Sequence, residues 1–316
     1  MKYFRRYAFC IPVLGKDQSA IYNLQKGQIK LIPNSMVEAI EQLDANPVAE
    51  IISELHEDSI EIFESYLQFL IENDLGFLTD EPALFPAIDF QTWDSPEMIN
   101  NAIIEYSQVY DFDLLCQQLN NLLCKYLEIR VESLDFSEHE KIVRCFEGTL
   151  FRSISIVAAH HPSLTEEKLG KLCNKEQRVS RYIIYKAPSE FREKAYPRMR
   201  FTVKDVSQQF TEHFPQDSYY ISLPFFRESK LFNPYYNKKV CIASDGSIKN
   251  CLMHTKSYGN LAINSLDEVI NQESFRALWH ASHDKILGIK DSPLRYCQLY
   301  SSNLRKTDKG LYEMIP

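Results

Sequence analysis

Strand-like and helix-like runs alternate between residues 102 and 203, and this alternation constrains the fold more than any other feature of the sequence. The strand candidates are rich in Ile, Val and Tyr and span 102–106, 126–131, 152–158, 181–185 and 201–203. The helix candidates between them span 113–123, 137–146 and 165–173. Strands that alternate with helices along a chain are typical of a parallel β/α array. We therefore expect an α/β fold with a partial (β/α) barrel over residues 83–230.

The N-terminal region shows a different order of elements. Three short strands are expected at 3–12, 19–24 and 28–32, separated by turns that contain Gly15 and Gly27. Three helices follow: one opens at Pro33-Asn34, one takes Asn46-Pro47 as its cap and first-turn proline, and one runs over 58–73. Phe77-Leu78 is expected as a short wing strand. This order predicts a winged-helix-like domain over residues 1–82.

The charge of this region excludes one common use of a winged helix. The net charge of the chain is −8, yet from Leu31 to Cys124 there are 19 acidic residues and no Lys or Arg. A protein that lies on nucleic acid needs clustered Lys and Arg to replace phosphate counterions. An edge strand beside a helix can instead capture an extended peptide by strand addition. We therefore expect peptide recognition and no nucleic acid partner.

The edge at the third strand supplies the candidate binding residues. Backbone pairing is assigned to Gln28, Ile29, Lys30 and Leu31, and the pocket to Phe63, Tyr66 and Phe77. The alternative for the aromatic residues is a place in the core, because apolar residues at helical spacing usually face inward.

Other sequence features exclude several classes of protein. Only 9 residues are Gly, and neither GxGxxG nor GxxxxGK occurs, so the backbone cradle of nucleotide-binding enzymes is not expected. No stretch approaches the ~20 apolar residues of a membrane helix, and the first residues do not have the pattern of a secretory leader. Eight Cys in 316 residues are too dilute for a disulfide scaffold. We expect a cytoplasmic protein with no membrane partner.

The last hundred residues carry the most specific motifs. KKVCIASDGSIKNC, residues 238–251, predicts a hairpin with its turn at Asp245-Gly246. MHTKSYGNL, a helix beginning at Ser265 and KDSPLRYC follow. This order resembles a SPASM domain of peptide-modifying radical SAM enzymes. With FLIENDLGFLTDEP and WDSPEMINNAI, the chain is similar to the grasp-with-spasm peptide maturase family.

The resemblance implies a function in peptide maturation. Members of that family are expected to act beside an ATP-grasp ligase on a ribosomally made precursor peptide, whose leader is held by the N-terminal domain. Residues 231–316 would then be a degenerate SPASM-like domain.

The sequence departs from the radical SAM pattern at its cysteines. The CxxxCxxC motif of the radical SAM core is absent, and Ile289, Ser292, Cys297 and Ser301 stand where the resemblance implies a CxxC followed by further Cys. Cys251 alone falls at a family ligand position. An iron-sulfur cluster needs about four thiolate ligands. We therefore expect no cluster, no catalytic residue and no radical chemistry by this chain.

A zinc site is the remaining possibility for a metal, because zinc accepts sets of three Cys and one His. Its candidate ligands are Cys241, Cys251, His254 and Cys297. The alternative, which we favour, is that these Cys are ordinary buried thiols.

Three functions therefore stay open. The first is a peptide-binding component of a maturation system that has no radical chemistry of its own. The second is a cluster-dependent enzyme of the radical SAM/SPASM type. The third is a structural adaptor that docks on an acidic ligase surface through a basic patch of Lys290, Arg295, Arg305, Lys306 and Lys309.

Overall fold

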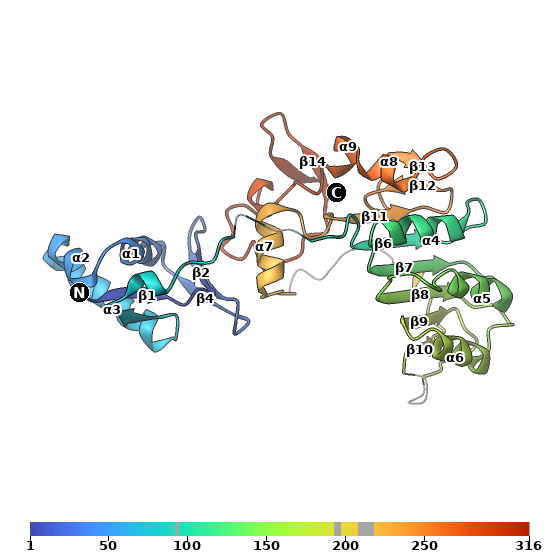
Figure 1. The fold of residues 1–316 in the computed structure, drawn as a ribbon, viewed down its shortest axis with the longest axis horizontal. Coiled ribbons are helices and arrows are strands. Elements are labelled where there is room, and N and C mark those ends of the chain that lie inside the picture. Colours follow the sequence, from blue (N-terminus) through green and yellow to red (C-terminus); the bar gives the residue numbers. More distant parts are fainter. Residues whose placement is uncertain (91, 93–94, 193–196, 208–217, 316) are drawn as a thin grey trace. The chain divides into compact units, whose positions relative to one another are not determined.

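The structure is a computed structural model that describes residues 1–316 except 91, 93–94, 193–196, 208–217 and 316. The chain divides into two compact units (Figure 1). The first contains residues 1–94, 214–234 and 280–316, and the second contains residues 95–213 and 235–279. Residues 1–82, expected as one domain, all lie in the first unit. The expected segments 83–230 and 231–316 each contribute to both units.

The N-terminal part of the first unit contains two small antiparallel sheets. One pairs β1 (Tyr3–Arg6) with β5 (Gly76–Thr79), which confirms the expected short strand at Phe77-Leu78. The other has the strand order β2 (Cys10–Val13), β3 (Ser19–Asn23), β4 (Gln28–Ile32). The single strand expected over 3–12 is wrong: a turn closed by the Cys10 N–H on the Tyr7 carbonyl (2.8 Å) splits it between the two sheets.

Three helices follow β4 as expected: α1 (Asn34–Ala45), α2 (Val48–Glu54) and α3 (Glu57–Glu72). The expected role of Asn46 as the cap of α2 is wrong, because Pro47 occupies the cap position and no side chain caps this helix. The Asn46 amide instead donates to the Gln42 carbonyl at the end of α1. The Asp44 carboxylate, near the end of α1, accepts hydrogen bonds from the Arg6 guanidinium at 2.6 and 3.2 Å, which fixes α1 to β1.

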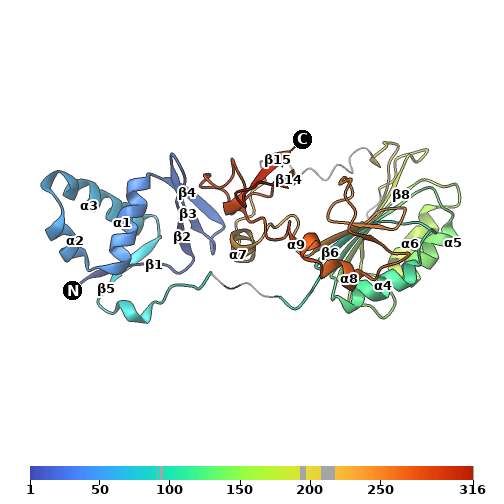
Figure 2. The ribbon, with the colours of Figure 1, turned by 90° about the horizontal axis from the view of Figure 1, so that it is seen from above.

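The sheet of β2, β3 and β4 has a core on each face. Ile21 and Ile32 point toward the helices, in a cluster that includes Ile40, Leu43 and Leu70. The other face contributes a second cluster, whose buried members are Val13, Ala20, Tyr22, Leu24, Phe226, Tyr296 and Cys297. Phe226 belongs to α7 (Leu223–Leu231), which lies beside this sheet in both views (Figures 1 and 2). Distant parts of the chain therefore complete the N-terminal fold.

The second unit is built on an eight-stranded, mostly parallel sheet. Its strand order is β10-β9-β8-β7-β6-β11-β12-β13, and pairing is parallel from β10 to β11. The strands are β6 (Asn101–Glu105), β7 (Tyr126–Val131), β8 (Ser153–Ala159), β9 (Val179–Tyr185), β10 (Met199–Phe201), β11 (Lys239–Ile242), β12 (Ser247–Lys249) and β13 (Gly259–Asn260). The expected parallel β/α array is confirmed, and so is the hairpin, formed by antiparallel β11 and β12.

The helices of the array cover one face of this sheet. They are α4 (Phe112–Asn121), α5 (Phe136–Arg144) and α6 (Glu166–Lys175), and Figure 2 shows them along the same side. Right-handed crossovers between strands that are sequential neighbours place their helices on one face. In β7, Leu127, Ile129 and Val131 are accordingly buried, whereas Glu128 and Arg130 alternate with them and are only partly covered.

The remaining elements are short. In the second unit, α8 (Leu266–Ile270) begins at the expected Ser265 with a capping box to Glu268, and α9 (Glu273–Arg276) follows. The first unit also contains 3-10 helices at Pro82–Leu84 and His283–Lys285 and the hairpin of β14 (Asn303–Lys306) and β15 (Tyr312–Ile315). No helix in the described part of the chain has the length and apolar character needed to cross a membrane.

Candidate functional site

The strand β4 forms one edge of the three-stranded sheet. Within the described residues it pairs only with β3, in a register that places Lys30 opposite Ile21 and Ile29 opposite Tyr22. Lys30 therefore faces the same side as the helical core, and Ile29 faces the side of α7. Every second residue of an edge strand directs its backbone N–H and C=O away from its partner. The outer side of β4 can thus pair with a further strand.

The opposite edge of the sheet, at β2, is less suited to pairing. Pro12 lies within β2 and has no backbone N–H to donate. A cavity of about 490 Å³ lies against this strand. It is lined by Ile11, Pro12 and residues of the segment that follows β5, including Phe85 and Ile88. Of the two edges, β4 is therefore the better template for strand addition.

Two contacts join the second half of α3 and the residues just after it to residues that flank β4 in the sequence. Near the end of β4, the Tyr66 hydroxyl lies 2.7 Å from the Ser35 hydroxyl. Near its start, the Lys26 ammonium donates to the Asp74 carboxylate just beyond α3 (3.1 Å). These two contacts connect α3 to the residues just before and just after β4.

A groove of about 450 Å³ adjoins the first half of β4. Its lining residues are Gly27, Gln28, Ile29, Lys30, Tyr219, Ile221 and Leu294. Ile29, Ile221 and Leu294 also pack against the core cluster on the α7 side of the sheet. The groove therefore has an apolar base on this side of β4.

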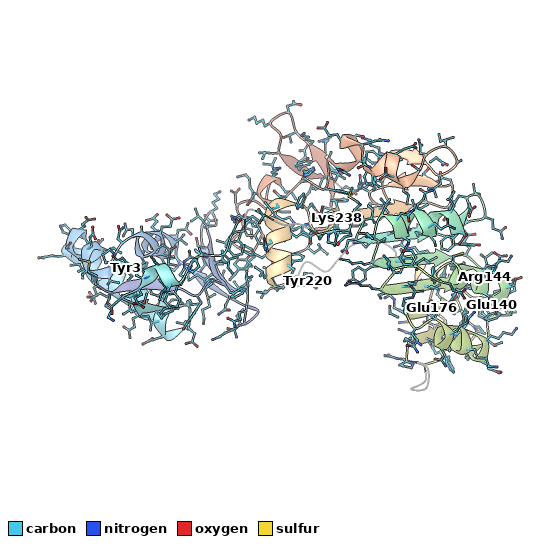
Figure 3. The ribbon with its side chains drawn as sticks, in the orientation of Figure 1. Tyr3, Glu140, Arg144, Glu176, Tyr220 and Lys238 are labelled. Atoms are coloured by element: carbon cyan, nitrogen blue, oxygen red, sulfur yellow. The ribbon has the colours of Figure 1, made fainter. Side chains whose placement is uncertain are left out.

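The outer wall of the groove is held by the C-terminal part of the chain. The Tyr220 N–H donates to the Cys297 carbonyl at 2.7 Å, and Tyr219 forms an antiparallel bridge with Gln298. Figure 3 shows Tyr220 at the start of α7, where its ring stacks on that of Phe225. The backbone before α7 is thereby fixed next to the sheet.

Gly27 at the tip of the β3–β4 hairpin is favoured by its backbone conformation. Its φ is +65°, a left-handed conformation that favours glycine. A Cβ at this position would lie 3.7 Å from the Ile221 carbonyl oxygen. Gly27 is also one of the residues that line the groove.

The ionisable groups near the groove offer binding but no nucleophile. Burial raises the pKa of the Cys297 thiol to about 11, and burial also holds the pKa of Tyr22 well above its usual value. Both groups stay protonated at neutral pH, and a protonated thiol is a poor nucleophile. Lys26 is paired with Asp74, whereas Lys30 has no hydrogen-bond or ion-pair partner among the described residues.

The structure places the sequence-predicted residues in different surroundings. Gln28, Ile29 and Lys30 line the groove, and Leu31 is 51% exposed on the same strand. Phe63 is 5% exposed in the helical core, which is the alternative given for the aromatic residues.

The other two aromatic candidates do not line the groove either. Tyr66 packs against the helical core and bonds Ser35, and Phe77 lies against Tyr7 and Phe85 at ring-centre distances of 5.4 and 4.7 Å. The sequence analysis missed Tyr219, Ile221 and Leu294. No local pattern marks these three residues as neighbours of β4.

The candidate metal ligands are engaged with other groups. In the second unit, the Cys241 thiol contacts the Asn250 carbonyl (3.5 Å), the Tyr235 hydroxyl lies 3.8 Å from the Cys251 sulfur, and the Tyr236 hydroxyl lies 3.3 Å from His254 Nε2. Cys297 belongs to the first unit, where its sulfur lies 3.6 Å from the Tyr22 hydroxyl. In the part of the chain that the structure describes, no three or more His, Cys, Asp or Glu side chains are grouped as a metal site requires.

The basic patch proposed for an adaptor is largely neutralised. Arg295 donates to Asp284 and to the Leu14 carbonyl, Lys290 pairs with Asp291, and Arg305 pairs with Glu313. Lys306 and Lys309 are exposed and have no ion-pair partner within the described residues. Two scattered lysines are a weak basis for docking, because exposed charges contribute little individually.

In comparisons with known proteins, no family model matches the chain and no curated protein is significantly similar to it.

Proposed function

We propose that this protein binds an extended segment of a precursor peptide along β4 and presents the rest of that peptide to a separate modifying enzyme. The observation that carries the proposal is the outer side of β4, which has no strand partner among the described residues and lies beside a groove lined by Gln28, Ile29 and Lys30. Backbone pairing supplies affinity in strand addition, and side-chain pockets supply selectivity. Both components are present at this edge.

The order of the helices and strands supports a winged-helix-like fold for the N-terminal part. Three strands are followed by three helices and then by β5, which pairs with β1. The eight-stranded sheet of the second unit supports a partial barrel, and β11 with β12 supports a degenerate SPASM-like region. Together with the sequence resemblance, these elements favour a leader peptide as the ligand and an ATP-grasp ligase as the partner enzyme.

Holding the leader would raise the reaction rate without any catalytic residue in this chain. A tethered segment reaches an effective concentration of about a millimolar near its partner when the linker is short and flexible. The modifying enzyme would then act on the tethered core of the precursor. The lack of a CxxxCxxC motif in the sequence is consistent with this division of tasks.

Binding is tested by titrating the full chain with fluorescent leader peptides from short reading frames encoded beside it. We expect a saturable rise in anisotropy for the cognate leader. Each backbone nitrogen of the bound segment is then methylated in turn. Strand addition predicts that methylation abolishes binding at every second position and is tolerated at the positions between, because only alternate N–H groups face β4.

Two variants locate the contact on the protein. Leu31→Asp and Tyr219→Ala change side chains that are each 51% exposed, so the fold should tolerate them, and both should weaken binding. Leu114→Asp is the matched control, because Leu114 is 50% exposed on α4 of the second unit. Strand addition at β4 would be contradicted if no leader peptide bound saturably. It would also be contradicted if the effects of methylation did not alternate from one residue to the next.

A further inference from the structure

We infer that the strand bound along β4 carries an acidic residue opposite Lys30, with an apolar residue on each side of it, opposite Ile29 and Leu31. This inference rests on the proposed function and specifies its ligand. It follows from how the three β4 side chains are distributed over the two faces of the sheet.

The apolar part of the pattern comes from the α7 side of the sheet. Ile29 and Leu31 share that face, because residues two apart in a strand point the same way. Ile29 borders the groove together with Ile221 and Leu294. Leu31 lies one step further along and is 51% exposed. An added strand would bury apolar side chains next to both Ile29 and Leu31, which is favourable because it removes apolar surface from water.

The acidic part of the pattern comes from Lys30, on the opposite face. Its ammonium has no partner among the described residues, although the nearby Lys26 is paired with Asp74. The Asp74 carboxylate, just beyond the end of α3, is therefore already paired. A residue directly opposite Lys30 in an added strand lies within side-chain reach, and opposite charges in such cross-strand pairs are favourable. A carboxylate is the complementary group.

The pattern is the same for both directions of the bound chain. Apolar–acidic–apolar reads identically forward and backward, so parallel and antiparallel addition to β4 predict one consensus. The inference therefore depends only on which face each β4 side chain occupies.

The test selects peptides from a displayed library of random linear sequences on the full chain. For the natural protein we expect enrichment of a central Asp or Glu flanked directly by Leu, Ile, Val or Phe. The same library is selected on Lys30→Glu, for which we expect Lys or Arg at the centre and unchanged apolar flanks. A peptide with Asp at the centre should bind this variant about tenfold more weakly than it binds the natural protein, because an attraction becomes a repulsion.

Two further variants test whether the preference at the central position depends on Lys30 itself or on any change of charge in the first unit. Lys306→Glu reverses the charge of another strand lysine of the first unit and should leave the central preference unchanged. Leu31→Ser should relax the apolar preference on one flank only. Circular dichroism of each variant checks that the fold is retained.

The outcomes distinguish the inference from the function on which it rests. If peptides are enriched but their central residue does not respond to Lys30→Glu, the inference is overturned and peptide binding stands. If no peptide is enriched on the natural protein, the proposed function fails as well. If the preferred central residue changes from acidic to basic with Lys30→Glu but not with Lys306→Glu, the result supports both the inference and the proposed function.

Discussion

The Tyr22 hydroxyl, in the central strand β3, donates to the carbonyl oxygen of Pro293 at 2.8 Å across 271 residues of sequence. Tyr22 is fully buried, and its ring also packs edge-on against Phe226 of α7. Leu294, the next residue after Pro293, lines the groove beside β4. One buried hydrogen bond thus connects the middle of the N-terminal sheet to the wall of the candidate site.

We predict that Tyr22→Phe destabilises the first unit by about 1 to 2 kcal/mol, because it leaves the partly buried carbonyl oxygen of Pro293 without this donor. The same change should weaken leader binding, since the wall at Leu294 loses its fixed position. Urea unfolding and anisotropy titrations measure the two effects. Tyr126→Phe is the control, because Tyr126 is 44% exposed and its hydroxyl has no described partner. Equal stabilities of the Tyr22 and Tyr126 variants would contradict this role of the hydrogen bond.

A fragment of residues 1–82 should not form a well-packed domain on its own. The α7 face of its sheet is covered in the full chain by Phe226 and Tyr296, which the fragment lacks. Val13, Ala20 and Tyr22, which are buried in the full chain, would then be exposed to solvent. We expect the fragment to bind a hydrophobic dye and to unfold without a sharp transition. Cooperative unfolding of a dye-free fragment would show that this face needs no cover.

The strands β6, β7, β8 and β9 were predictable because each has a local pattern of Ile, Val and Tyr, whereas the two-residue strand β13 was not predicted. The strand at 126–131 was identified to the residue, since its apolar residues alternate and turn residues flank it. The break between β1 and β2 was missed because Tyr7, Ala8 and Phe9 lack the Gly, Pro, Asn and Asp that usually mark turns.

Of the residues at the candidate site, those of β4 could be predicted from the sequence and those of the opposite wall could not. An edge strand follows from the order of three consecutive strands, so Gln28, Ile29 and Lys30 were accessible to sequence reasoning. The position of Ile221 and Leu294 beside them results from packing between segments about 190 and 265 residues further along the chain. Phe63 shows the converse limit, because an apolar helical stripe does not reveal whether its aromatic residue faces a core or a pocket.

Leu43→Ala should destabilise the first unit by about 2 to 5 kcal/mol. Leu43 is fully buried between α1 and its neighbours in the helical core, so truncation removes buried surface and leaves a cavity. Leu31→Ala makes the same chemical change at a side chain that is 51% exposed and should cost less than about 0.5 kcal/mol. Chemical denaturation compares the two variants. A similar loss from both would show that Leu43 does not belong to a close-packed core.

The stability of the first unit should decrease as the solution is acidified, in part because of His283. This side chain is fully buried, its Nδ1 bonds the Arg295 carbonyl, and its Nε2 has no partner among the described residues. Burial disfavours the charged imidazolium and lowers the pKa of His283 to about 4. In the unfolded chain its pKa returns to about 6.5.

The direction of the effect follows from which state binds the proton. Between about pH 6.5 and about pH 4 the unfolded chain is protonated at His283 and the folded chain is not, so the free energy of unfolding falls as the pH falls. The full loss is roughly 3 kcal/mol. His283→Asn retains a side-chain N–H for the Arg295 carbonyl but does not titrate, so its stability should depend less on pH in this window. His56→Asn, at an exposed position, should keep the natural pH dependence. Identical pH profiles for His283→Asn and the natural protein would mean that His283 does not stay neutral in the folded state.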